Sequence, residues 1–253
     1  MRPPASFASS LGGRVASFVL LLAVWEGAAR LAGSRLFPPA SAVFAVLAQE
    51  VQHGTLPYHL GVTLVRVAAA FVIAMAIGGA VGILMGRSSR VDAVLDSWLV
   101  LLLNLPAVVV IVLAYVWFGL TEVAAVGAVA INKIPTVAVS LREGARALER
   151  DYAEMAQSFR LGWWRRIRHI VLPQLYPYVV AAARSGLALI WKIVLVVELL
   201  GRPNGVGFEI QLYFQLFDVT HILAYSIAFA GIVQAIEWGM LQPIERRATR
   251  WRR

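Results

Sequence analysis

Repeated apolar runs of bilayer length constrain this chain more than any other feature of its sequence. An α-helix needs about 20 apolar residues to cross the hydrocarbon core of a membrane. Hydrophobic residues make up 60% of the chain and charged residues only 15%, whereas a soluble domain has no need of such runs. We therefore expect an all-α integral membrane protein. The six expected transmembrane helices are residues 15–33, 62–86, 94–117, 123–141, 178–200 and 222–241.

The expected membrane domain, residues 15–241, lies between two polar ends. Residues 1–14 are rich in Pro, Gly and Ser, and residues 242–253 form a basic tail. A charged start before an apolar run also describes a signal peptide. The first run, however, is of bilayer length, carries Glu26 and Arg30 near its far end, and has no convincing cleavage site. These features favour an uncleaved first transmembrane helix.

The distribution of arginine predicts the orientation in the membrane. The turn at 87–90, the segment 142–168 and both ends of the chain are basic, whereas the loops at 36–58 and 118–121 contain no Lys or Arg. The positive-inside rule then places both termini in the cytoplasm. A net charge of +9 could also suggest a nucleic-acid partner. Because the arginines collect in separate loops, we expect no nucleic acid.

Helix-breaking and small residues locate several expected features. Ser41 is a plausible N-cap of a short amphipathic helix that ends by Gly54 and lies outside the bilayer. Pro106 removes a backbone donor and should kink the third span. Residues 202–220 are expected to form an outer loop. Small residues at four-residue spacing should let the second span approach a neighbour closely. They are Ala70, Ala74, Gly78, Gly82 and Gly86.

The sequence carries no motif for catalysis or metal binding. It lacks the GxxxxGK[ST] phosphate loop, HExxH, and GxSxG with partner residues. Its four histidines lie far apart, and it has no cysteine. We expect no catalytic residue, no metal site and no cofactor bound by this chain.

Polar residues within the expected spans are candidates for a solute pathway, because an intramembrane charge is costly. Lys133 and Lys192 either line a pathway that favours an anion, or snorkel or form a salt bridge within the bundle. Asn104, at the expected kink, either meets the solute or satisfies a freed backbone carbonyl. Glu198 lies six residues after Lys192 on a different helical face, so the two need not pair.

The long polar stretch from Glu154 to Pro173 follows a spaced pattern. It reads EMA, three residues, R, nine residues and IVLP. In this register it resembles the permease subunits of bacterial ABC importers, whose cytoplasmic motif reads E-A-A, three residues, G, nine residues, and I-x-L-P. Met155 and Arg160 depart from that motif, and Gly162 stands two places after the expected glycine.

This resemblance implies a type I ABC importer permease fold with a cytoplasmic coupling helix at 150–170, which docks on an ATPase subunit. An amphipathic helix lying on the membrane surface is the alternative for this stretch. The residues that the resemblance assigns to ATPase coupling are Glu154, Ala156, Phe159, Arg160 and Gly162.

Three further stretches, 37–41, 117–120 and 198–207, resemble nitrate, sulfonate, taurine and bicarbonate permeases. That resemblance implies a bacterial inner membrane complex of two permease copies, two ATP-binding subunits that hold ATP and Mg, and an external, periplasmic substrate-binding protein. The solute would be small and anionic or organic. An ion-coupled secondary transporter that depends on Glu26 or Glu198 remains open, as does a membrane-embedded enzyme acting on lipid.

Overall fold

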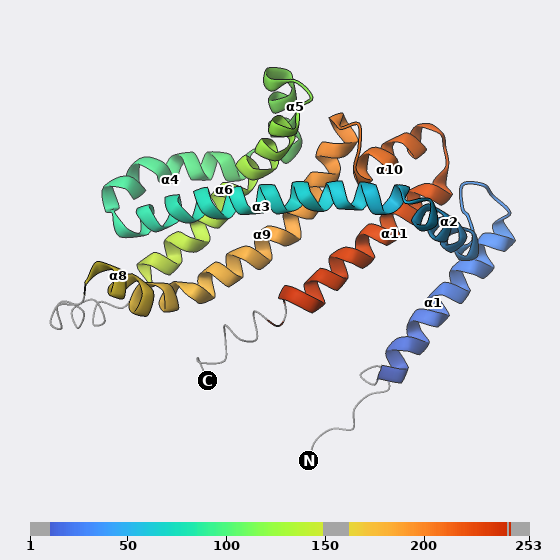
Figure 1. The fold of residues 1–253 in the computed structure, drawn as a ribbon, viewed down its shortest axis with the longest axis horizontal. Coiled ribbons are helices and arrows are strands. Elements are labelled where there is room, and N and C mark those ends of the chain that lie inside the picture. The colour runs from blue at the N-terminus through green and yellow to red at the C-terminus, as the bar shows by residue number, and fades with distance from the viewer. Residues whose placement is uncertain (1–10, 149–161, 242, 244–253) are drawn as a thin grey trace, which may run out of the picture.

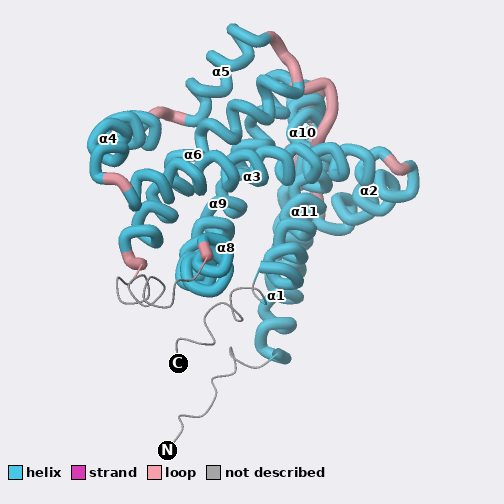
Figure 2. Tube along the Cα trace, turned by 60° about the vertical axis from the view of Figure 1, so that its left-hand side comes forward, coloured by secondary structure: helices cyan, strands magenta, loops and turns pink. Residues whose placement is uncertain are grey.

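The computed structural model describes residues 11–148, 162–241 and 243 (Figure 1). Within these ranges the chain is helical, and short loops join the helices (Figure 2). The helices are α1 (Leu11–Ala32), α2 (Ala40–His53), α3 (Thr55–Arg87), α4 (Ser89–Asn104), α5 (Ala107–Phe118), α6 (Glu122–Arg146), α8 (Trp163–Arg166), α9 (Leu172–Gly201), α10 (Val206–Gln215) and α11 (Val219–Ile236). Two π-helical turns, Ile167–Val171 and Glu237–Leu241, precede α9 and follow α11.

Five of these helices, α1, α3, α6, α9 and α11, are long and apolar enough to cross a membrane. The pair α4 and α5 meets the same criterion together, which gives up to six spans. Helices extend beyond the expected apolar cores because the flanking residues are compatible with a helix end: Pro57, for example, lies in the first turn of α3, where its missing N–H breaks no helical bond. Thus α3 begins at Thr55 rather than 62, and α1 begins at Leu11, within the stretch expected to be a tail.

The break between α4 and α5 is much sharper than a kink. The two helices meet at 97° across Leu105 and Pro106. Pro106 has no N–H to donate to the preceding turn, and Leu105 adopts the extended conformation that proline imposes on the residue before it. The turn at Ser88 lets α4 run back beside α3, and the break makes α5 turn away from α4 (Figure 1).

Glycines allow α3 and α6 to pack closely along much of their length. A Cβ atom on Gly78 would lie 2.7 Å from the backbone oxygen of Ile134, and one on Gly86 would lie 2.6 Å from that of Arg142. A Cβ atom on Gly82, between them, would overlap the backbone of Ala138. In lipid, such close backbone packing replaces the hydrophobic driving force between helices. The predicted small-residue interface is confirmed.

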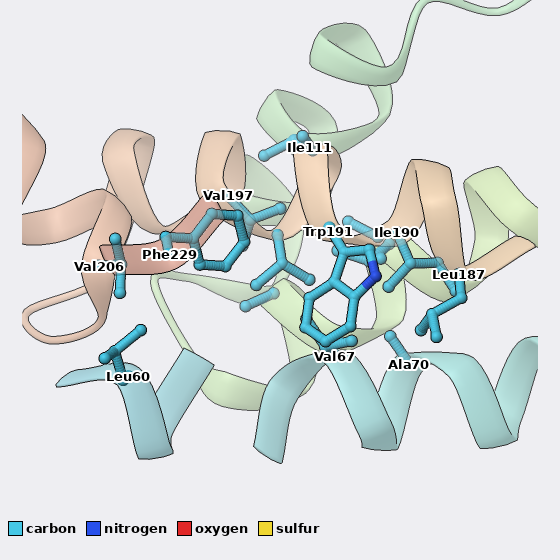
Figure 3. Close-up of a cluster of buried hydrophobic side chains, with 14 of the residues drawn as sticks. Leu60, Val67, Ala70, Ile111, Leu187, Ile190, Trp191, Val197, Val206 and Phe229 are labelled. Atoms are coloured by element: carbon cyan, nitrogen blue, oxygen red, sulfur yellow. The ribbon is translucent and has the colours of Figure 1, made fainter. Parts of the chain in front are cut away.

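The apolar core lies where α9 crosses α3 and α6. Trp191 and Ile190 of α9 face Val67 and Ala70 of α3 in Figure 3. The Trp191 ring meets Phe229 of α11 edge to face, with ring centroids 6.0 Å apart. This core joins α9 to α3 and α6, reaches α11 through the Trp191–Phe229 contact, and positions the polar groups that α9 carries.

Two short helices differ from the sequence prediction. Helix α2 ends at His53, with Gly54 in the left-handed conformation at φ 82°, as predicted. The N-cap prediction is wrong: Pro39 occupies that position, and the Ser41 hydroxyl donates instead to Glu26 of α1 at 2.8 Å. The prediction of an outer loop at 202–220 is also wrong in part, because α10 forms within it, between α9 and α11.

Candidate functional site

A buried ionic cluster joins α3 to α9 near one end of the bundle. Arg66 of α3 donates from Nη1 to Oε1 of Glu198 on α9 at 2.8 Å. The two side chains are 4% and 0% exposed. The second carboxylate oxygen of Glu198 accepts from the Thr63 hydroxyl and from the Gly207 N–H, both at 2.9 Å. Opposite charges and full hydrogen bonding make such a buried pair tolerable within helices of bilayer length.

The same arginine reaches α6 and the loop before α10. Its Nε and Nη2 atoms donate to the two oxygens of Glu122 at 2.9 and 2.6 Å, a bidentate arrangement. The backbone and side-chain oxygens of Asn204 accept the remaining two donors. All five guanidinium N–H groups are therefore satisfied. Arg202 adds a further ion pair to Glu122 at 2.5 Å.

The start of α10 is fixed by His59 and by glycines that leave room for the Glu198 carboxylate. Gly205 has φ 108°, and a Cβ atom there would overlap this carboxylate. The Gly205 N–H donates to Nδ1 of His59 at 3.0 Å, so a neutral His59 ring carries its proton on Nε2. That nitrogen lies 3.0 Å from Glu209. Burial raises the pKa of the Glu209 carboxyl.

The ionic cluster therefore acts as a structural joint between α3 and α9. Within it, Glu198 connects the two helices rather than facing a cavity. The Glu198 carboxylate has no exposed surface, and both of its oxygens are bonded. The predicted pathway residue Glu198 thus lies within the joint. Lys192 lies elsewhere on α9, as the six-residue spacing indicates.

A basic pocket of about 370 Å³ lies between α9 and α11. Arg184, Ala188 and Lys192 line one wall, and their spacing of four residues puts them on one helical face. The remaining lining residues are Trp191, Phe229, Ala230, Val233 and Glu237. Lys192 lies nine residues before the end of α9, about 14 Å along the helix, and so within the span.

The two basic side chains of this pocket differ in whether an acidic side chain lies close to them. Arg184 lies 3.5 Å from Glu237, which offsets its charge. Lys192 is exposed and makes no hydrogen bond or ion pair with any residue that the structure describes. Of the predicted pathway residues, Lys192 lines this pocket. An ammonium group on an otherwise largely apolar wall suits one anionic group of a small solute.

The other two pathway candidates occupy different environments. Lys133 of α6 is 1% exposed, and a Cβ atom on Gly186 of α9 would lie 3.7 Å from its Cε. Its amine does not snorkel, and within the described ranges it makes no ion pair. The Asn104 amide donates to the Val100 carbonyl of its own helix at 2.7 Å. The Asn104 side chain is thus bonded to a carbonyl within α4, and not to that of Leu102, which Pro106 leaves without its usual helical donor.

The predicted coupling residues are described only in part. Glu154, Ala156, Phe159 and Arg160 lie outside the described residues. Gly162 is exposed and directly precedes α8. Trp164, also exposed, follows it with Arg165 and Arg168. No group of three or more His, Cys, Asp or Glu side chains able to hold a metal ion occurs in the described part of the chain.

Comparison with known proteins identifies the family. The family model described as "Binding-protein-dependent transport system inner membrane component" matches residues 75–236, from the second half of α3 to the end of α11. The chain belongs to this family. It is therefore a permease component of a binding-protein-dependent ABC importer and a multi-pass membrane protein.

Curated relatives of this permease are similar over most of its length. It is 26% identical over 235 residues to a putative aliphatic sulfonates transport permease of Bacillus subtilis, covering 92% of this chain and 85% of the relative. It is 28% identical over 244 residues to the taurine transport system permease of Escherichia coli, covering 94% and 88%. A bicarbonate transport system permease of Synechococcus elongatus is 28% identical over 172 residues, covering 68% and 62%.

A solved structure shares the fold of the permease. The crystal structure of an amino acid ABC transporter with histidines superposes with a TM-score of 0.62 and 21% identity, over 79% of this chain and 97% of the other. The all-α fold of an importer permease is thereby confirmed.

Sequence reasoning missed Arg66 and its partners, although a signal was present. His59, Thr63 and Arg66 are spaced four and three residues apart, which puts them on one face of α3. A lone arginine in an otherwise apolar run calls for a buried partner. The sequence could not indicate that the partners would be Glu122 and Glu198, because they lie 56 and 132 residues further along the chain.

Proposed function

We propose that this permease forms the membrane pathway of an ATP-driven importer for a small solute that carries an anionic group. Its family membership supports the importer assignment. The solute class rests on one observation in this chain, the unpaired ammonium group of Lys192 in the basic pocket. The named solutes of three relatives, aliphatic sulfonates, taurine and bicarbonate, all carry an anionic group at neutral pH.

The working assembly would contain two copies of this chain, two ATP-binding subunits and an external substrate-binding protein. ATP and Mg would be held by the ATP-binding subunits, since this sequence has no phosphate-binding loop. The arginine-rich segment 142–168 and both termini would lie in the cytoplasm of the bacterial inner membrane, in accordance with the positive-inside rule. The substrate-binding protein would then meet the opposite face, which carries α2 and α10.

Coupling would run through segment 150–170, which would dock on the ATP-binding subunit. Closure of the two ATP-binding subunits on ATP would move this segment and the helices attached to it. Rigid-body rotation of packed helices would then switch the pathway between outward and inward access.

Uptake by membrane vesicles tests this function. Vesicles that contain the whole assembly would be given radiolabelled taurine, ethanesulfonate or bicarbonate, with choline as a cationic control. Uptake of at least one anion should stop when ATP is depleted and the ion gradients are maintained. Anion uptake that persists under these conditions would contradict the proposal and favour an ion-coupled secondary transporter.

A further inference from the structure

A second ionic cluster joins α4 to α6 at the opposite ends of these helices from Asn104 and Glu122. Arg142 of α6 pairs with Asp96 of α4 and lies 3.4 Å from Asp92. Arg146, one turn later, pairs with Asp92 at 2.5 Å. We call these four residues the α4–α6 clamp. Asp92 and Arg142 are 21% and 15% exposed, whereas their partners Arg146 and Asp96 are 44% and 51% exposed, so each ion pair has one partly buried member and salt screens it only in part.

The clamp lies on the most closely packed end of α6. A Cβ atom on Gly86 of α3 would lie 2.6 Å from the Arg142 backbone oxygen. On the other side, a Cβ atom on Gly144 would lie 2.6 Å from the ring of Tyr178 on α9. Since backbone and ring leave no space on either side, this end of α6 is held firmly against α3 and α9. It ends at Arg146, four residues before the proposed docking segment 150–170.

Helix α4 is held much less firmly by apolar contacts. Leu99 is its one fully buried residue, in a small cluster with Met85 and Ala138. Its side chains Val94, Trp98 and Leu101 are more than half exposed. The half-buried Val91 and Leu95 pack against the same cluster, and the clamp adds ionic contacts to this small apolar attachment of α4. Beyond α4, the 97° break leads into α5.

We propose that the α4–α6 clamp makes α4 and α5 follow the nucleotide state of the ATP-binding subunits. Its four residues act as positioning residues for transport. They connect the end of α6 that precedes segment 150–170 to the span formed by α4 and α5. This inference rests on the proposed function, because it takes segment 150–170 to dock on the ATP-binding subunit.

Single cysteines test the clamp directly, because the natural chain has none. Leu105→Cys and Val109→Cys, introduced separately, place a reporter at the break and in the first turn of α5. The complete assembly, in nanodiscs with its co-purified ATPase, would be labelled with a membrane-impermeant maleimide. Labelling rates would be compared without nucleotide and with Mg·ATP and vanadate. In the parent protein we expect the rate to change severalfold on at least one reporter.

The clamp variant replaces all four residues, as Asp92→Asn, Asp96→Asn, Arg142→Gln and Arg146→Gln, because Arg146 and Asp92 would otherwise still join α6 to α4. It should lose most of the nucleotide-dependent change, whereas Arg142→Lys, which keeps the charge, should retain more of it. Glu143→Gln is the matched control, because Glu143 lies in the same turn and, among the described residues, its ion pairs are with Arg142 and Arg146 of its own helix rather than with α4. It should leave the change intact.

The possible results distinguish a failure of this inference from a failure of the proposed function. A clamp variant with the full nucleotide-dependent change would overturn the role of the clamp. So would a parent assembly that hydrolyses ATP while neither reporter responds, and in that case the importer assignment would stand. An assembly without any associated ATPase would instead overturn the proposed function itself.

Discussion

Replacing Glu198 by leucine should destabilise the permease more than any other single loss of charge among the described residues. Leucine would leave the Arg66 guanidinium beside an apolar group, and the Gly207 N–H would lose its acceptor. Removing one partner of a buried ion pair costs about 3–5 kcal/mol. Glu122 would still bind Arg66 through both of its oxygens, so the lower part of that range, about 3 kcal/mol, is expected.

A double variant tests whether Arg66 and Glu198 stabilise the permease through their mutual interaction. Arg66→Met combined with Glu198→Leu removes both charges, and the double variant should recover about 1–2 kcal/mol relative to the sum of the single variants. Glu237→Gln is the matched control. Its ion pair with Arg184 joins side chains that are 37% and 41% exposed, so its loss should cost less than about 1 kcal/mol.

Unfolding of the purified chain in mixed micelles with increasing SDS, followed by tryptophan fluorescence, measures these free energies. The reasoning would be refuted if Glu198→Leu cost no more than Glu237→Gln. Strict additivity of the Arg66 and Glu198 variants would also contradict it, because the two groups would then not interact.

Four further changes have distinct expected results. Gly82→Val should overlap the backbone of Ala138 and lower the unfolding free energy by at least about 1–3 kcal/mol in the same SDS assay. Lys133→Met should leave stability unchanged or raise it by about 1 kcal/mol in that assay, because the amine is buried and has no ion partner among the described residues; a large loss of stability would contradict this. Lys192→Gln should reduce anion uptake by about tenfold or more through loss of a charge-assisted contact, while ATP hydrolysis by the assembly persists. Glu154→Ala and Gly162→Pro should each lower the number of solute molecules imported per ATP hydrolysed, and normal ratios in both variants would remove the coupling assignment.

Much of the helical architecture could be predicted because bilayer length and small-residue spacing are local signals. The close contact of Gly78, Gly82 and Gly86 with α6 follows from their four-residue spacing. The break at Pro106 was likewise predictable from backbone chemistry, although its angle was not, because the angle depends on α4 packing against α3 and α5 packing against α6. Helix α10 was missed because its ten residues are too few for a span and lie between loop residues.

The polar residues were harder to predict because their roles depend on distant partners. Intramembrane position singled out Lys192 and Glu198, yet only the fold distinguishes an ammonium group facing a pocket from a carboxylate within an ionic joint. The pairing of Asp92 with Arg146 joins residues 54 positions apart and has no local signal.

Co-purification tests the central claim most directly. The tagged chain would be crosslinked in native membranes, solubilised in detergent, purified, and assayed for mass and ATP hydrolysis. We expect two copies of this chain with two copies of an ATP-hydrolysing subunit, in accordance with the family assignment. A crosslinked chain that carries no ATPase would contradict the account and favour an ion-coupled transporter.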